Sequence, residues 1–165
     1  MKNVRIECRI VRKLAPAARA GVTMFLHPTQ KPRGSMKQEA GEVLIVDADG
    51  PIRGLLATLV RRLPRKPVVA MDGNRALELL SSREFDAVVM DLLLTGASGM
   101  EILAHIGREK PQLLPRVIIV TTATGMAAKS EELKSVAAVL RKPFAVDELQ
   151  RVLRACCDEE KTGGQ

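Results

Sequence analysis

The chain has 165 residues, of which 46% are apolar, and carries a formal net charge of +7. That length suits one ordinary domain core rather than two full domains, and no apolar stretch approaches the roughly 20 residues that span a bilayer. The three cysteines are Cys8, Cys156 and Cys157, an odd number whose adjacent pair is poorly placed to bridge itself. A protein without transmembrane segments in a reducing, cytoplasmic setting is therefore expected.

The positive charge is confined to the first part of the chain. Residues 1–40 hold nine Lys and Arg residues against two acidic ones, an excess that equals the whole net charge, so residues 41–165 are neutral. Five prolines and glycines interrupt this segment, which favours a basic, mostly disordered N-terminal extension. Two alternatives stay open: a basic helix over about residues 3–14 that touches nucleic acid or an anionic membrane, and a natural start at Met36.

Beyond residue 41, apolar strands alternate with stretches of helical period. Strands are expected at about 42–46, 67–71, 86–90, 116–121 and 136–140, and helices from Pro51 and at about 74–82, 98–108, 125–134 and 146–157. Because each parallel crossover lays a helix on one face of the sheet, five such units predict an α/β, three-layer sandwich. The predicted domain covers residues 41–157 and is followed by a flexible tail over 158–165.

Polar residues follow several of these strands. Asp91 closes the apolar run from Phe85 to Met90, and Asp47 and Asp49 follow the run from Val43 to Val46. Carboxyl ends of parallel strands meet at one edge of the sheet, where ligands bind in such folds. Two or three carboxylates at one edge predict a site for a hard cation such as Mg²⁺.

The last two strands add groups that suit an anion. Thr121 and Thr122 follow the fourth strand, and Lys142 and Pro143 follow the fifth. A hydroxyl and an ammonium supply hydrogen bonds and charge to an anion placed on Asp91. Together with a cation, these groups indicate phosphoryl transfer to a carboxylate, with Asp91 as the nucleophile.

Four motifs in order resemble the receiver domain of two-component response regulators, over roughly residues 41–157. The motifs are Val43 to Asp49, Val88 to Gly96 with Gly99 to Glu101, Val117 to Ala123, and Leu140 to Phe144. The resemblance implies a (βα)5 flavodoxin-like fold with sheet order 2-1-3-4-5, Mg²⁺ as cofactor and phosphorylation of Asp91. It also implies that Lys142 contacts the phosphoryl group and that the peptide bond before Pro143 is cis.

Within the same resemblance, Thr122 is the preferred switch hydroxyl because it precedes Ala123, and Thr121 is the alternative register. Three positions depart from the family pattern. Ala48 stands where a second acidic residue normally ligates Mg²⁺, so metal binding is expected to be weakened, with Asp47, Asp91 and Asp49 as the remaining candidate ligands. Val139 replaces the switch aromatic, and Thr95 replaces a proline, which should loosen the turn after Asp91.

Less specific roles are weighed for the remaining residues. Aspartates also cap helices, which is an alternative for Asp47 and Asp91, and a simple loop carboxylate is the alternative for Asp49. His105 is expected on a helix surface, and Cys156 and Cys157 are expected to pack in the core rather than act as redox centres. Arg53 is expected on the outward face of the first helix.

The leading interpretation is a single-domain receiver, a phosphoacceptor signalling domain rather than an enzyme, with at most slow autodephosphorylation. Its expected partners are a histidine kinase or phosphotransfer protein and a downstream protein that contacts about residues 125–157. Binding to nucleic acid is not expected in this interpretation. The alternatives are a pseudo-receiver that is not switched by phosphate and a nucleic-acid-associated protein that uses its basic tail.

Overall fold

The computed structural model describes residues 40–122 and 132–158. Its sheet has five parallel strands in the order β2-β1-β3-β4-β5, as the flavodoxin-like fold requires. The strands are β1 (Glu42–Val46), β2 (Lys66–Ala70), β3 (Ala87–Met90), β4 (Val117–Thr121) and β5 (Ala138–Arg141). The predicted fold class and strand order are therefore confirmed. The basic extension up to residue 39, most of the helix expected at 125–134 and the last seven residues lie outside the described ranges.

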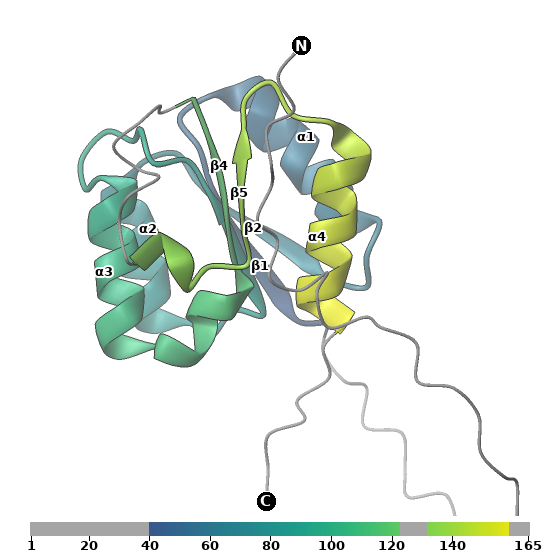
Figure 1. Ribbon diagram of the computed structural model, residues 1–165. Helices are drawn as coiled ribbons and strands as arrows, with labels where there is room; N and C mark the ends of the chain where they lie inside the picture. The colour runs from purple at the N-terminus through teal and green to yellow at the C-terminus, as the bar shows by residue number, and fades with distance from the viewer. Residues whose placement is uncertain (1–39, 123–131, 159–165) are drawn as a thin grey trace, which may run out of the picture.

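Helices cover both faces of this sheet. They are α1 (Gly50–Arg61), α2 (Gly73–Ser82), α3 (Gly99–Glu109) and α4 (Val146–Asp158), with short 3-10 helices η2 (Pro111–Arg116) and η4 (Glu132–Lys134). Figure 1 shows α1 and α4 on one side of the sheet and α2 and α3 on the other. None of the helices in residues 40–122 and 132–158 is long and apolar enough to cross a membrane.

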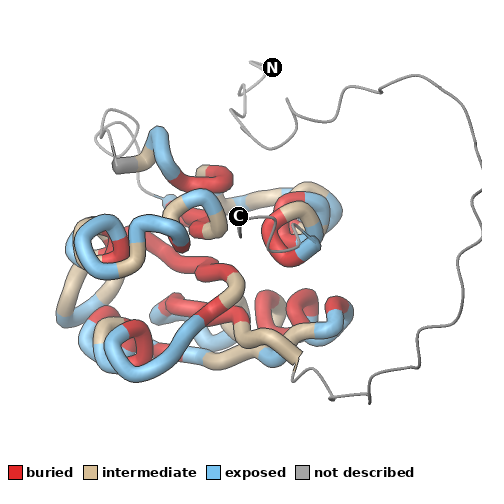
Figure 2. The backbone as a smooth tube through the Cα atoms, turned by 90° about the horizontal axis from the view of Figure 1, so that it is seen from below, coloured by how far each residue is buried: buried red, intermediate tan, exposed pale blue. Residues whose placement is uncertain are grey.

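The alternation of side chains along the strands divides the core into two layers. In β1, Val43 and Ile45 pack with α1 and α4, whereas Leu44 and Val46 pack with α2 and α3. A strand that is apolar on both faces is typical of a parallel sheet covered on both sides. The central strands β1, β3 and β4 are almost wholly buried, whereas the edge strand β2 is mostly not. Figure 2 shows buried segments through the middle of the fold and helices that are buried along one side. The expected packing role of the cysteine pair agrees with this picture, because both side chains are buried beside α1.

Local signals explain where the helices begin. Asp49 caps α1 by accepting a hydrogen bond from the Ile52 amide, and Asp72 caps α2 in the same way. Ser98 and Glu101 form a reciprocal capping box at the start of α3. Each cap satisfies amide groups that have no partner inside the helix and fixes the point where the chain leaves the sheet edge. The loops that carry the candidate site therefore end on fixed helix starts.

Candidate functional site

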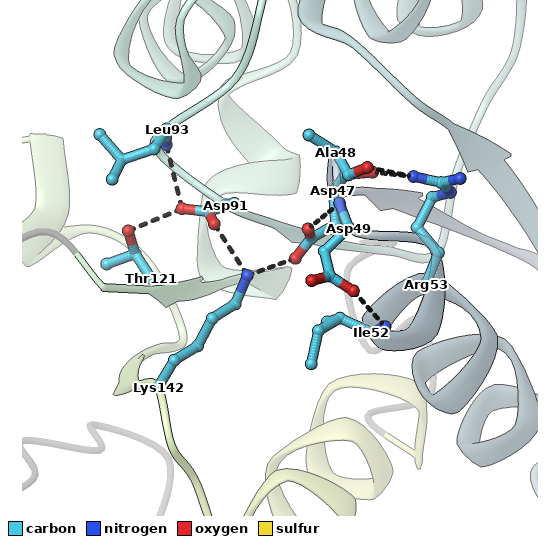
Figure 3. A network of polar contacts seen from close by, with 9 residues as sticks. All are labelled: Asp47, Ala48, Asp49, Ile52, Arg53, Asp91, Leu93, Thr121 and Lys142. Carbon is cyan, nitrogen blue, oxygen red and sulfur yellow. Dashed lines mark hydrogen bonds and ion pairs between the residues drawn. The ribbon is translucent and has the colours of Figure 1, made fainter.

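Four strands bring polar side chains to one edge of the sheet. Asp47 follows β1, Asp91 follows β3, Thr121 ends β4 and Lys142 follows β5. Figure 3 shows these four side chains turned toward one another, and three of them, Asp47, Asp91 and Thr121, are buried. The convergence predicted from the strand ends is thus present.

Lys142 joins the two carboxylates at the centre of the site. Its Nζ lies 2.6 Å from Asp47 Oδ2 and 2.8 Å from Asp91 Oδ2. One ammonium is shared by two carboxylates, which leaves the trio with a net charge of −1 when all three are ionised. The Lys142–Pro143 peptide bond is cis, as the family resemblance implied.

The Asp91 carboxylate is held by donors at both oxygens. Its Oδ1 accepts hydrogen bonds from the Thr121 hydroxyl at 2.7 Å and the Leu93 amide at 3.0 Å, and its Oδ2 accepts from Lys142. Burial opposes ionisation of this carboxyl group. The hydrogen bonds from Leu93, Lys142 and Thr121 outweigh that effect and hold the pKa of Asp91 below its ordinary value. Asp91 is therefore an oriented, ionised carboxylate at neutral pH.

The charge state of Lys142 follows from the same contacts. Burial favours the neutral amine, but the hydrogen bonds and charges of Asp47 and Asp91 dominate and raise the pKa of Lys142. The lysine is therefore a fixed cation beside Asp91, as a group that binds an anion must be.

The choice between the two threonines is corrected by the structure. Thr121, not Thr122, donates its hydroxyl to Asp91, and Thr121 is buried whereas Thr122 is exposed. Successive side chains of an extended chain point in opposite directions, so only one of two adjacent threonines can face the site. The sequence held a usable signal, because Asp47, Asp91 and Thr121 are each the first polar residue after an apolar run of four. Thr122 instead lines a shallow groove of about 370 Å³ with Pro143 and Phe144.

Asp49, a candidate metal ligand, caps α1 in this structure. Its carboxylate accepts from the Ile52 amide at 3.0 Å and so caps α1, while its own amide donates to Asp47 Oδ1 at 2.8 Å. The helix start thus holds Asp49 in a capping role that was considered only for Asp47 and Asp91. The backbone of Asp49 nevertheless helps to orient Asp47.

Arg53 belongs to the site surroundings, although its place in α1 predicted an outward side chain. Its guanidinium donates to the carbonyl oxygens of Asp47, at 2.7 Å, and Ala48, at 2.8 Å. These two bonds hold the loop between β1 and α1 from outside (Figure 3). Nothing in the sequence pattern marks this contact, because the acceptors are backbone atoms.

Asp47 and Asp91 could supply only part of the ligands that a metal ion needs. One ammonium nitrogen reaches both Asp47 and Asp91, so a small cation in the same place would also meet both. Ala48 offers a methyl group, and no group of three His, Cys, Asp or Glu side chains in the described part of the chain could hold a metal. Mg²⁺ keeps several waters and commonly binds through one or two carboxylates and phosphate oxygens, so the pair fits this ion.

Comparisons with known proteins identify the family of this chain. The family model for the response regulator receiver domain matches residues 43–154, which is more than half of the chain. A putative NtrX-like response regulator of Rickettsia felis is 33% identical over 122 residues, which cover 73% of this chain and 26% of that protein. The transcriptional regulatory protein TcrA of Mycobacterium tuberculosis is 29% identical, over 68% of this chain and 44% of that protein. The chain thus spans less than half the length of these two curated relatives.

Solved structures give the same result. The receiver domain of a Francisella response regulator is 30% identical with a TM-score of 0.61, and the match covers 73% of this chain and 99% of that one. The response regulator TrrA of Thermotoga maritima, in complex with Mg²⁺ and BeF, shares the fold with a TM-score of 0.62 at 24% identity, over 70% of this chain and 98% of that one. With the family model, the strand order and the cluster around Asp91 in agreement, this chain belongs to the response regulator receiver domains of two-component signalling.

Proposed function

We propose that this receiver accepts a phosphoryl group on Asp91 from a histidine kinase or a phosphotransfer protein. The observation that carries the proposal is the set of contacts around Asp91, which is ionised, buried and held by Lys142, Thr121 and the Leu93 amide. A carboxylate used only as a helix cap would accept from the amides of the next helix. Asp91 instead meets donors from two other strands.

The transfer would form a bond between an Asp91 carboxylate oxygen and phosphorus as the bond from phosphorus to the histidine nitrogen of the donor breaks. Lys142 and Thr121 already donate to the Asp91 oxygens, so we assign them to the transferred phosphoryl oxygens. Fixed donors of this kind stabilise charge that develops during transfer without having to reorganise. Mg²⁺, when bound by Asp47 and Asp91, would supply further positive charge to those oxygens.

We also propose that the metal is held more weakly than is usual in this family. Asp47 and Asp91 are present, but position 48 is alanine and the Asp49 carboxylate caps α1. The loss of one carboxylate ligand removes both a coordinating oxygen and a negative charge. Phosphorylation should therefore need a higher Mg²⁺ concentration.

Output is proposed to pass through protein contacts. The surface predicted for a downstream partner, about residues 125–157, includes η4, β5 and α4 in its described part. Exposed Arg141 and Arg151 lie on this surface and give it positive charge.

A pseudo-receiver is the second candidate, and two substitutions favour it. Ala48 removes a metal ligand, and Val139, which is partly buried against the layer of α2 and α3, cannot act as an aromatic switch. The Asp91 contacts oppose this alternative, because a module without phosphate chemistry has no need of a shared ammonium at its sheet edge.

Incubation with acetyl phosphate and Mg²⁺, followed by intact mass measurement, distinguishes the two. The proposal predicts the mass of one added phosphoryl group in the wild type and none in Asp91→Asn, which keeps the side-chain shape. Asp147→Asn, an exposed change on α4, is the matched control and should take up the group normally. No adduct in the wild type combined with an adduct in Ala48→Asp would identify a pseudo-receiver that has lost its metal site.

A further inference from the structure

The loop that follows Asp91 is fastened to the start of α2. The Gly73 amide donates to the Thr95 carbonyl at 3.0 Å, and the Ala97 amide donates to the Asn74 side-chain oxygen at 3.1 Å. The β3–α3 loop covers residues 92–98. Two consecutive residues of α2 therefore hold its outer part, at Thr95 and Ala97. Through these contacts the loop links Asp91, which precedes it, to α2, a helix that supplies no residue to the site.

The contact is too close for ordinary side chains. A Cβ atom at Gly73 would collide with the Ala97 carbonyl oxygen, and one at Gly96 would lie 2.8 Å from the Asn74 amide nitrogen. Gly96 also has a φ of 73°, a conformation that glycine adopts at low cost. The start of α2 is itself fixed, because Asp72 caps it by accepting from the Arg75 amide at 2.9 Å. Asn74 thus projects from a fixed helix end onto a closely fitted loop.

The same loop supplies a donor to Asp91. Leu93, in its inner part, donates its amide to Asp91 Oδ1, and the Gly99 amide closes the loop by donating to the Leu92 carbonyl at 3.1 Å. The position of the Leu93 amide therefore depends on how the rest of the loop is held. Position 95 is threonine, which does not stiffen the turn as the proline of the family pattern would, and the restraint at this turn comes from α2.

We propose that Asn74 is a positioning residue for the phosphoacceptor site, which acts by holding the β3–α3 loop so that the Leu93 amide stays on Asp91. The inference rests on the proposed function of Asp91 and extends it to a residue outside the site. It differs from a general stabilising role, because only the loop should respond to the loss of the Asn74 oxygen. The carboxylate in Asn74→Asp keeps an acceptor for the Ala97 amide, whereas Asn74→Ala removes it.

Amide hydrogen exchange measured by NMR, together with the rate of phosphorylation by acetyl phosphate, tests the proposal. In Asn74→Ala the Ala97 and Leu93 amides should exchange faster, and phosphorylation should slow, each by about twofold to tenfold, the range for one lost hydrogen bond. Asn74→Asp should restore both, and Thr95→Pro added to Asn74→Ala should restore part of the rate by stiffening the turn. The control is Arg75→Ala, because that exposed side chain pairs with Glu78 rather than with the loop.

Unchanged exchange at Leu93 and Ala97 in Asn74→Ala would overturn the proposal. So would equal effects in Arg75→Ala, or a failure of Asn74→Asp to restore the rate. A wild-type protein that takes up no phosphoryl group would overturn the proposed function instead, while the exchange rates would still decide whether Asn74 holds the loop.

Discussion

The two ends of the parallel strands use charged residues in opposite ways. The carboxyl ends form what is called here the carboxyl edge of the sheet, and the amino ends form the amino edge. At the carboxyl edge, one ammonium, from Lys142, serves two buried carboxylates, Asp47 and Asp91. At the amino edge, charges are matched one to one and are more exposed: Arg65 pairs with Asp86, Arg83 with Glu42 and Lys110 with Glu84. The amino edge is balanced, whereas the carboxyl edge keeps an excess negative charge.

This difference indicates which edge supports stability and which supports chemistry. Matched, partly exposed ion pairs contribute modestly to stability and need no ligand. A buried cluster with unequal charges is costly to keep, and it can lower its energy by binding a cation. Substitutions at the amino edge should therefore change only the free energy of unfolding. Substitutions at the carboxyl edge should change phosphorylation and metal binding.

The largest effect is expected for Lys142→Met. Loss of a fixed cationic donor should slow phosphorylation of Asp91 by roughly 100-fold, and two buried carboxylates that lose their shared cation should reduce the free energy of unfolding by about 2 kcal/mol. Both are measured by acetyl phosphate labelling and urea unfolding. Lys110→Met at the amino edge is the matched change, because its partner Glu84 is largely exposed, and it should cost under about 1 kcal/mol and leave labelling unchanged. Equal labelling in the two variants would remove the functional distinction between the edges.

The next effect is expected at the amino edge itself. Arg65 pairs with Asp86 at 2.8 Å and also donates to the Cys157 carbonyl at 2.7 Å, so it ties the end of α4 to the start of β3. Arg65→Met should lower the free energy of unfolding by about 2 kcal/mol, because two partly buried acceptors lose a charged donor. The labelling rate under folding conditions should stay at the wild-type value. A slower rate in a fully folded variant would show that the two edges are coupled.

Sequence patterns were sufficient for the fold and for three of the site residues. Apolar runs of about four residues marked the strands, and the polar residue after two of those runs located Asp47 and Asp91. The position of Lys142 followed from the same reasoning on the last strand. Burial on both faces of a parallel sheet makes such runs a strong signal, since few other structures require them.

The rest of the site depends on contacts that periodicity does not encode. Thr121 is the first polar residue after the apolar run of β4, but the match of the family motif before Ala123 favoured Thr122, and only the folded strand shows which hydroxyl faces Asp91. Asp49 was predicted to be a metal ligand or a loop carboxylate, and its capping of α1 became evident only once the helix start was located. Arg53 bonds to backbone carbonyls of the loop just before its own helix, and Asn74 bonds to a backbone amide of the β3–α3 loop. Such contacts appear only once the chain is folded.

A smaller effect is expected from Ala48→Asp, which increases the excess negative charge of the carboxyl edge. The new carboxylate would add an oxygen ligand beside Asp47 and should tighten Mg²⁺ binding by about tenfold, measured by titration of the protein with Mg²⁺. Phosphorylation at limiting Mg²⁺ should accelerate in parallel. Arg53 offers an internal check, because its contact with the Ala48 carbonyl is made by the backbone and should survive the substitution. Unchanged affinity would mean that the remaining ligands already complete the metal shell.

The smallest effect is a pH dependence that also separates the edges. The pKa of Asp91 in the folded protein lies below its ordinary value of 3.8. Folded protein therefore binds fewer protons at this group than unfolded chain, so the stabilising contribution is full above pH 3.8 and is lost as the pH falls through the lower folded value. Urea unfolding between about pH 5 and pH 2 should show a shallower acid loss of stability in Asp91→Asn than in the wild type. The exposed change Asp147→Asn should keep the wild-type slope, and an Asp91→Asn slope equal to it would mean that Lys142, Thr121 and Leu93 do not favour the ionised form.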